Sequence, residues 1–594
     1  MRTVGLGIQS FEKMRAENQF YVDKTAFIGE WYRKNDDITL ITRPRRFGKT
    51  LTIDMLCCFF SSSYAGRKDL FEGLAVGQDL QMMEKQGTVP VIRISFSGVK
   101  GETFYDFLTG MAGRVAELLY QYRFLLEDDR LDASDREILG ELSRLSPVIP
   151  DREKESARYS EYVHRLARSL GILSIWLSRV YGKKVYIFLD EYDTPLQTAY
   201  LRHYYEEAVS FMREMFSETF KDNEWMERAV ITGITRIAKE SLFSEMNNLA
   251  VYSVISGGYD TVFGFTKEEM DGILEEYGLT EKRDLVRFWY DGFAIGEEKE
   301  IYNPWSVISY LSRRNRPPAD YWAQSGGIGM VDHLVRRGSA GLKEGFQTLL
   351  GGGTIKRRIR EDLIFPRLDY DENAVWSLLI AAGYVKPLEE GTGGGYDGTF
   401  LPGTMPARMP KTTLSLTNYE SLVCLTEMVE GWFSTTAGNF MEEFAEAVVR
   451  DDLPQMNERL QRVVMDCVSA FDSGLKPSDG KVQPENYFHG LTLGMLTCLS
   501  DSYRLTYNRE GGFGRYDVCL EPLDREDGPD ACIFEFEVFS EKEGDKSLED
   551  TARRARQQID DRKYDTELLA RGFSKNRIRK YGMGFRGKEV LIIR

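Results

Sequence analysis

The segment DITLITRPRRFGKTLTIDMLCCFF, residues 37–60, decides the fold. It joins a short β-type run at 37–42 to an apolar run of helical length at 51–60, through a basic loop that ends in Gly-Lys-Thr. A strand, such a loop and a helix form the arrangement that cradles nucleotide phosphates, because the loop amides and the helix N-terminus face the anion. We therefore predict a nucleotide site with contacts from Arg46, Gly48, Lys49 and Thr50.

Two side chains of this loop have separate expected tasks. Lys49 would reach the β and γ phosphates, and Thr50 would place its hydroxyl on Mg²⁺. Arg43, however, stands where the pattern G-x-x-x-x-G-K-[ST] has its first glycine. A bare Gly-Lys-Thr is a weak signal, so the nucleotide site needs support from elsewhere in the chain.

The residues around the loop alternate between strand and helix patterns. Further buried-strand candidates lie at 90–96, 184–189 and 229–232, each separated from the next by enough chain for helices. This alternation predicts an α/β fold in which helices cover both faces of a parallel sheet. From about 266 to 385 the pattern is mainly helical, as in a lid or subdomain. Residues 391–410 contain six glycines and three prolines, so the main domain boundary is expected there.

A buried strand in KVYIFLDEYDTPL, residues 184–196, ends in two carboxylates. Carboxylates at that position are costly unless they serve a metal or a water molecule. Asp190 would hold magnesium, directly or through water, and Glu191 would act as the general base on the attacking water. The alternative is an acidic loop that caps the following segment.

The next strand, in AVITGITRIAKESLFSEMNNL at 229–249, also ends in polar residues. Thr232 at the strand tip would sense the γ-phosphate, and Arg236 just after it would stabilise the charge of the transition state. Packing or capping is the alternative for both residues.

Eight segments between residues 11 and 307 carry a specific resemblance to a known family: FEKMRAENQFYVDKTAFI, RPRRFGKTLTIDML, FEGL, IFLDEYDTPL, TGITRIAKESLFSEMNNL, FGFTKEE, WYDGF and YNPWSV. The N-terminal two thirds of the chain resembles the bacterial and archaeal AAA-ATPase-like family, whose members usually carry a C-terminal nuclease domain of the PD-(D/E)XK superfamily. The resemblance implies an AAA/RecA-like fold and ATP binding at Lys49, Thr50 and Asp190. That family itself uses arginine in place of the first loop glycine, so Arg43 is no departure from it.

Carboxylates recur near the C-terminus. The strand candidates there are EGGFGRYDVCL at 510–520, which contains GFGRYDV (512–518), and CIFEFEVF at 532–539, which contains IFEFEV (533–538). Residues two apart share a face of a strand, so Glu535 and Glu537 would lie opposite an apolar face. If the two strands pair, Asp517 approaches Glu535, and the carboxylates would bind one divalent cation that activates water against a phosphodiester. Ordinary acidic residues on a solvent-facing strand are the alternative.

This part of the chain resembles the nuclease domain that is fused to the same ATPase family, through the two strands above, ENYFHGLTLGML (485–496) and ARRARQQIDDRKY (552–564). By that likeness Glu485, Asp517 and Glu535 would bind the metal, and Gln558 would line the site from a helix. The fold implied is an α/β restriction-endonuclease-like domain. The family has lysine two residues after the second acid, where this chain has Glu537, which would be an extra ligand or base, or the sign of a nuclease that has lost its activity.

The domain organisation follows from these patterns. We expect an ATPase-like domain at 1–265, a helical lid or subdomain at 266–390, a linker and helical connector at 391–480, and the nuclease-like domain at 481–594.

Composition limits the remaining possibilities. Seven scattered cysteines and four distant histidines exclude a zinc knuckle, so any metal site would use carboxylates with Mg²⁺ or Mn²⁺. The net charge of −16 excludes a protein that coats nucleic acid over its whole surface, although residues 551–594 hold thirteen Lys or Arg against five Asp or Glu. We find no signal peptide or membrane-spanning run and expect a cytoplasmic protein.

Three functions stay open at this stage. The first is an ATP-binding and ATP-hydrolysing enzyme that binds and cleaves DNA of unknown strandedness. The second is an ATP-dependent switch, which pairs or forms a homo-oligomer, with an inactive nuclease fold as its interaction surface. The third is an ATPase with no nucleic-acid partner.

Overall fold

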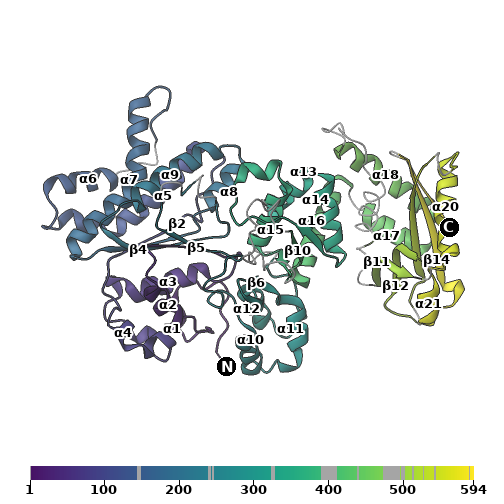
Figure 1. The fold of residues 1–594 in the computed structure, drawn as a ribbon, viewed down its shortest axis with the longest axis horizontal. Helices are drawn as coiled ribbons and strands as arrows, with labels where there is room; N and C mark the ends of the chain where they lie inside the picture. The colour runs from purple at the N-terminus through teal and green to yellow at the C-terminus, as the bar shows by residue number, and fades with distance from the viewer. Residues whose placement is uncertain are drawn as a thin grey trace, which may run out of the picture. The chain divides into compact units, whose positions relative to one another are not determined.

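The computed structural model describes the chain except for residues 1, 144–148, 238–241, 244–245, 323–327, 389–410, 438–439, 472–495, 497–498, 500–501, 512–513, 526–527, 541–543 and 587–588. The chain divides into two compact units (Figure 1). Unit 1 comprises Met1–Ser339 and Thr354–Leu422, and unit 2 comprises Ala340–Gly353 and Val423–Arg594. The expected boundary at 391–410 lies outside the described residues.

Unit 1 is built on a five-stranded parallel sheet in the order β2-β3-β4-β1-β5. Its strands are β1 (Ile38–Thr42), β2 (Val91–Ser95), β3 (Val185–Asp190), β4 (Met226–Gly233) and β5 (Leu249–Tyr252). The first four confirm the predicted strands, whereas β5 was not predicted. Parallel pairing in register brings the ends of β1, β3 and β4 to one edge of the sheet, as Ile41 pairs with Thr232 and Leu189 with Ile231.

Helices cover both faces of this sheet (Figure 1). On one face lie α1 (Phe11–Ala16), α2 (Ala26–Lys34), α3 (Lys49–Phe60) and α4 (Leu80–Met83); on the other lie α5 (Phe104–Gln121), α6 (Ala133–Ser143), α7 (Ser156–Tyr181) and α9 (Tyr205–Phe220). The short α8 (Thr194–Leu201) follows β3. Because both faces are covered, every residue of β1 and β3 is buried, which explains their unbroken apolar sequences.

The rest of unit 1 is mainly helical, with short strands among the helices. The helices are α10 (Lys267–Glu276), α11 (Arg283–Tyr290), α12 (Pro304–Ser312), α13 (Ile328–Arg337) and α15 (Glu372–Ala382). A hairpin of β6 (Phe293–Ile295) and β7 (Glu298–Ile301) and a small sheet of β8 (Ile355–Arg357), β10 (Thr412–Leu416) and β9 (Val385–Pro387) complete it. Asn303 begins α12, since its side-chain oxygen accepts from the amides of Trp305 and Ser306 at 2.9 and 3.3 Å.

Unit 2 contains a mixed five-stranded sheet in the order β11-β12-β13-β14-β15. The strands are β11 (Tyr503–Gly511), β12 (Gly514–Pro522), β13 (Ala531–Val538), β14 (Ile578–Arg586) and β15 (Glu589–Ile593). Only β13 and β14 pair in parallel, and α20 (Leu548–Asp561) and α21 (Thr566–Ala570) connect them. The other helices are α14 (Ala340–Leu350), α17 (Phe440–Arg450) and α18 (Leu453–Phe471), and α16 (Tyr419–Ala437) crosses the boundary between the units.

Strand β13 has a different core on each face. Phe534 and Phe536 pack into the cluster that contains Phe444 of α17 and Leu460 of α18. Ile533, on the opposite face, packs into the cluster of α20 and α21. The residues at 535 and 537 share the face of Ile533, as the spacing predicts, and the structure places this face beneath α20.

Helix α20 lies unusually close to strand β14. A Cβ built on Gly582 would stand 2.2 Å from the carbonyl oxygen of Ala552, and one on Gly584 would stand 2.9 Å from the amide nitrogen of the same residue. Only glycine fits at such a distance, so these two residues bring the helix down onto the sheet. None of the helices in the described part of the chain has both the length and the apolar character needed to span a membrane.

Candidate functional site

The loop between β1 and α3 is held by the side chain of Arg43. This side chain is fully buried. Its guanidinium donates to the carbonyl oxygens of Tyr252, Gly258 and Tyr259 at 3.0, 2.6 and 3.3 Å, and burial lowers its pKa to about 10. Arg43 therefore fixes the loop to the end of β5, a structural task that no glycine could perform.

Lys49, the first residue of α3, is bound by its own loop. Gly48 precedes it with φ +83°, a conformation that glycine adopts without strain. The Lys49 ammonium donates to the carbonyl oxygens of Arg43 and Pro44 at 2.9 and 2.7 Å, and burial lowers its pKa to about 8. A buried ammonium held only by carbonyl oxygens is placed to exchange them for phosphate oxygens, which carry full charge.

Asp190 joins the phosphate loop to the third strand. Its carboxylate accepts from the Thr50 hydroxyl at 2.6 Å and from the Thr232 hydroxyl at 2.5 Å. The three residues come from β3 and β4, which are neighbours in the sheet, and from α3, the helix that follows β1. A carboxylate and two hydroxyl groups at one point offer the oxygen ligands that Mg²⁺ prefers, so these residues fit a Mg-nucleotide.

Glu191 follows with a left-handed backbone, φ +54°, which is uncommon for a residue other than glycine. Its side chain is largely shielded from water, and desolvation, followed by the neighbouring Asp190, raises its pKa. The Thr194 hydroxyl donates to it at 3.3 Å. A carboxylate with a raised pKa beside a nucleotide site suits the general-base role expected for it.

Sequence reasoning missed Asp193. This buried carboxylate accepts from the amides of Ile234 and Thr235 at 3.1 and 2.8 Å and from the Thr235 hydroxyl at 2.7 Å. It thus sets the path of the chain after β4. Its place before Thr194 and a proline is typical of a helix cap, but its side chain accepts from the Gln197 side chain of α8 at 2.9 Å and from no backbone amide of that helix.

The two candidate arginines lie in different surroundings. Arg236 forms ion pairs with Glu361 at 2.5 Å and with Asp362 at 2.6 Å, so its charge is already compensated within unit 1. Arg46 has φ +66° and an exposed side chain, whose guanidinium carbon stands 4.4 Å from the ring centre of Trp305. Trp305 belongs to α12, so the helical part of unit 1 contacts the phosphate loop directly.

The second set of candidate residues lies in unit 2, on the face of the sheet beneath α20. The Asp517 carboxylate accepts from the amide of Phe536 at 2.7 Å, and the Glu535 carboxylate accepts from the amide of Asp517 at 3.3 Å. The amide nitrogen of Gln558, from α20, donates to Glu535. Strand pairing and the following helix therefore bring three predicted residues together.

Glu535 is almost completely buried, and desolvation, followed by the charge of Asp517, raises its pKa to about 9. Two neighbouring carboxylates in such a place repel one another unless a proton or a cation lies between them. This pair therefore fits a divalent cation. Glu485 and His489 lie outside the described residues, within which no group of three or more Asp, Glu, His or Cys side chains is gathered to hold a metal.

Glu537, which stands in place of the expected lysine, pairs with a cation from α20. Its carboxylate accepts from Arg554 at 3.0 Å, and the same guanidinium pairs with Asp545 at 2.9 Å. Arg554 lies one helical turn before Gln558, on the face of α20 that meets the sheet. A positive charge is thus present next to position 537, although it comes from the helix.

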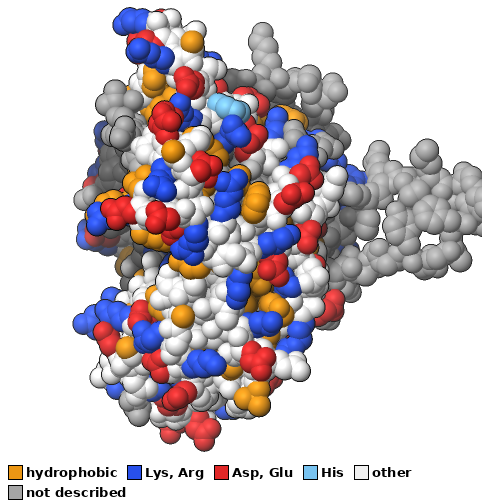
Figure 2. Space-filling model, turned by 90° about the vertical axis from the view of Figure 1, so that its left-hand side faces the viewer, with side chains coloured by type: hydrophobic (Ala, Val, Ile, Leu, Met, Phe, Trp, Pro, Cys, Tyr) orange, Lys and Arg blue, Asp and Glu red, His pale blue; other side chains and the backbone are white. Residues whose placement is uncertain are grey.

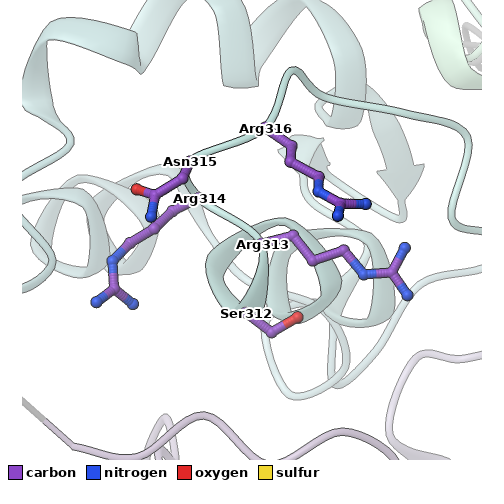
Figure 3. Close-up of a pocket in the computed structure, with 5 residues that line it drawn as sticks. All are labelled: Ser312, Arg313, Arg314, Asn315 and Arg316. Carbon is purple, nitrogen blue, oxygen red and sulfur yellow. The ribbon is translucent and has the colours of Figure 1, made fainter.

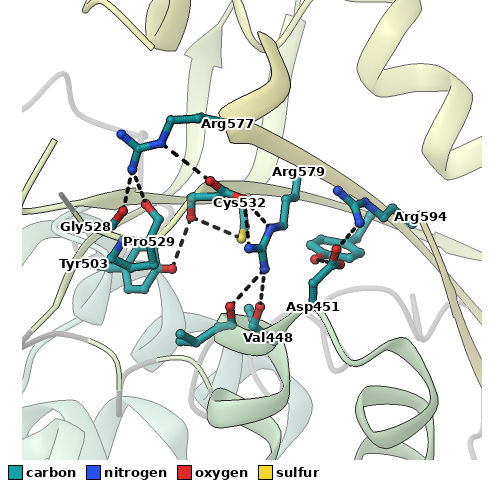
Figure 4. A network of polar contacts seen from close by, with 12 residues as sticks. Val448, Asp451, Tyr503, Gly528, Pro529, Cys532, Arg577, Arg579 and Arg594 are labelled. Carbon is teal, nitrogen blue, oxygen red and sulfur yellow. Dashed lines mark hydrogen bonds and ion pairs between the residues drawn. The ribbon is translucent and has the colours of Figure 1, made fainter. Parts of the chain in front are cut away.

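The basic C-terminal segment uses much of its charge internally (Figure 4). Arg579 binds Asp530 and the carbonyl oxygens of Val448 and Val449, while Arg594 pairs with Asp451. Lys580 likewise pairs with Asp560 and Asp565, both at 2.8 Å. These pairs stabilise unit 2 and reduce the charge that it offers to a phosphate backbone.

Comparisons with known proteins agree with this division of the chain. Residues 5–243 match the family model described as a predicted AAA-ATPase, and residues 483–594 match that of the PD-(D/E)XK nuclease superfamily. The chain is also 30% identical over 337 residues to a protein of Azotobacter chroococcum mcd 1 described as "Uncharacterized protein in vnfD 5'region". That match covers 56% of this chain and 56% of the relative, so the chain spans little more than half of that protein's length. An AAA-ATPase-like domain and a PD-(D/E)XK-like domain are therefore combined in one polypeptide.

Proposed function

We propose that the chain binds and hydrolyses ATP in unit 1 and cleaves DNA, with a divalent metal, in unit 2. The observation that carries the proposal is the placement of Asp517 beside the buried Glu535 beneath Gln558, because these two neighbouring carboxylates need a cation to ionise fully. A metal there supplies a Lewis acid and an activated water molecule.

In unit 1 each residue has one task in this proposal. Lys49 neutralises phosphate charge, and Thr50 with Asp190 holds the magnesium that accompanies ATP. Glu191 takes a proton from the attacking water, and its raised pKa makes it a better base than an exposed carboxylate. Thr232, whose hydroxyl donates to Asp190, senses the γ-phosphate.

The ATPase half is tested by two substitutions with different expected effects. Lys49→Ala removes the phosphate contact, so nucleotide affinity should be lost. Glu191→Gln keeps the shape and the contacts of the side chain but cannot accept the proton, so binding should persist while turnover slows. If both variants hydrolyse ATP as fast as the parent, Lys49 and Glu191 do not belong to the active site.

The nuclease half is tested with plasmid, linear duplex and single-stranded DNA, with Mg²⁺ or Mn²⁺, with and without ATP. In Asp517→Ala only one carboxylate of the pair, that of Glu535, remains to bind the metal, so cleavage should disappear. Asp530→Ala is a matched control, because it removes an aspartate just before β13 that pairs with Arg579 outside the proposed site. Cleavage that survives Asp517→Ala would refute the site.

The alternative is an ATP-dependent switch with an inactive nuclease fold, and Glu537 is the observation that favours it. A lysine at this position would orient water and stabilise negative charge, whereas glutamate has the opposite sign. The contact with Arg554 favours activity, since that guanidinium neutralises Glu537. Absence of cleavage under every condition, with ATP binding intact, would select the switch.

A further inference from the structure

A hollow of about 570 Å³ lies at the end of α12 and is lined by residues 312–316 of unit 1 (Figure 3). Arg313 and Arg316 are exposed and extend to the same side of the chain, whereas Arg314 and Asn315 extend to the other. The lining thus offers three guanidinium groups and an amide within four consecutive residues, with the hydroxyl of Ser312 beside them.

The three guanidinium groups have no carboxylate partner among the residues that the structure describes. The contacts around them involve an aromatic ring and the main chain: Arg313 lies over the ring of Tyr321 at 5.6 Å, and the ammonium of Lys282 donates to the carbonyl oxygen of Arg314 at 3.1 Å. The nearby Arg283 and Arg287 show the contrast, since each pairs with acidic residues. In a chain with 93 acidic and 77 basic residues, adjacent uncompensated arginines are unusual.

The end of the helix does not account for this arrangement. A cation beside the last turn of a helix is stabilised by the helix dipole, an effect confined to that turn. Arg316 lies four residues beyond Ser312, where α12 ends, and is therefore outside its reach. Pro317 and Pro318 follow, and their fixed φ angles stiffen the chain just after the arginines.

Closely spaced guanidinium groups are the usual partners of a phosphate backbone, because each presents a planar fork of donors to phosphate oxygens. Duplex DNA places one negative charge about every 1.7 Å along its axis, so Arg313 and Arg316, which extend to the same side, can meet successive phosphates, while Arg314 offers its charge on the other side of the turn. On the face shown in Figure 2, by contrast, basic and acidic side chains are interspersed wherever the structure describes them.

We propose that Arg313, Arg314 and Arg316 bind backbone phosphates of nucleic acid, so that unit 1 holds the polymer independently of the nuclease site. The proposal rests on the proposed function only in its choice of nucleic acid as the ligand. It adds a contact surface on the ATPase-like unit, where the motifs place none, and it implies no sequence specificity, because phosphates carry no base information.

The test compares the full chain with a variant carrying Arg313→Gln, Arg314→Gln and Arg316→Gln, by fluorescence anisotropy of a labelled duplex in EDTA over a range of salt. Each phosphate contact contributes about 0.9 to the slope of log affinity against log salt, so the variant should lose about 2 to 3 from the slope. A matched control carries Arg114→Gln, Arg158→Gln and Arg168→Gln, which remove the same charge from arginines paired with Glu117, Glu155 and Glu218. ATP hydrolysis by both variants should equal that of the parent.

The possible results separate the two proposals. A reduced slope in the first variant alone supports the surface, whatever the outcome of the cleavage assay, because EDTA removes the metal. An unchanged salt slope in the first variant overturns the proposed surface, and so does an equal loss of slope in the control variant. Neither result affects the test of Asp517. Tripolyphosphate that displaces the duplex at equal phosphate concentration would show a site for free polyphosphate and overturn the assignment to a polymer.

Discussion

Glu420 in α16 gives a prediction about the pH dependence of stability. This carboxyl group is fully buried in unit 1, where it accepts from the Ser306 hydroxyl at 2.7 Å and from the Trp322 amide at 2.7 Å. Burial raises its pKa to about 8, against the hydrogen bonds, which lower it. In the unfolded chain the group returns to about 4.5, so ionisation is opposed only in the folded protein.

The sign and the size follow from linkage. A carboxyl group with a raised pKa in the folded state contributes fully to stability below pH 4.5, and this contribution is lost as the pH rises through 8. At about 1.36 kcal/mol per pH unit, the difference between the two pKa values corresponds to a loss on the order of 5 kcal/mol. Glu420→Gln keeps an acceptor for both donors and carries no charge, so it should remove this dependence.

The assay is urea denaturation followed by tryptophan fluorescence between pH 4.5 and 8.5. Seven of the eight tryptophans precede residue 423, so the signal reports mainly on unit 1. The variant should match the parent at pH 4.5 and exceed it by several kcal/mol at pH 8.5. Glu298→Gln, at an exposed position in β7, is the control for loss of charge and should leave the pH profile unchanged. A variant that loses stability equally at every pH would show that the site requires the ionised carboxylate.

Two further predictions concern close contacts. Arg43→Gly restores the standard phosphate-loop glycine but leaves the carbonyl groups of Tyr252 and Gly258 without their donor. Thermal melting should therefore show a destabilised unit 1, and ATP titration should show no gain in affinity. Tighter ATP binding by a stable variant would contradict the structural role of Arg43. Gly582→Ala forces a methyl group against the Ala552 carbonyl and should destabilise unit 2 by about 1–3 kcal/mol in calorimetry, whereas an unchanged transition would mean that α20 shifts freely.

The parts of the fold that were predictable are those with a local signal. The unbroken apolar runs at 184–189 and 229–232 predicted central strands because strands covered on both faces bury every side chain. The alternation in IFEFEV predicted which residues share the face of Glu535. Strand β5 was missed, because its four residues are only partly buried and follow directly on a segment of mixed composition.

The side-chain partners could not be predicted, since they come from distant parts of the chain. Arg43 binds carbonyl groups more than 200 residues away, and Arg236 pairs with Glu361, 125 residues away. The charge of Glu537 is compensated by Arg554, which lies on α20 and not on the same strand. Sequence spacing gives the chemistry of each residue, but the sheet order decides which charges are compensated.

That distinction is also the basis on which we propose a nucleic-acid surface on unit 1. The surplus of thirteen basic over five acidic residues at 551–594 points to the C-terminal segment, yet Arg554, Arg579 and Lys580 are paired with carboxylates at 2.8–3.0 Å. A cation paired at contact distance contributes little field beyond a Debye length of roughly 8–10 Å. The arginines at 313–316 have no such partner within the described part of the chain, so their charges are the ones that the proposal assigns to a phosphate backbone. Whether unpaired charges matter more than paired ones is therefore measured directly by the salt slope, which should fall when these three arginines are replaced and stay unchanged when paired arginines are replaced.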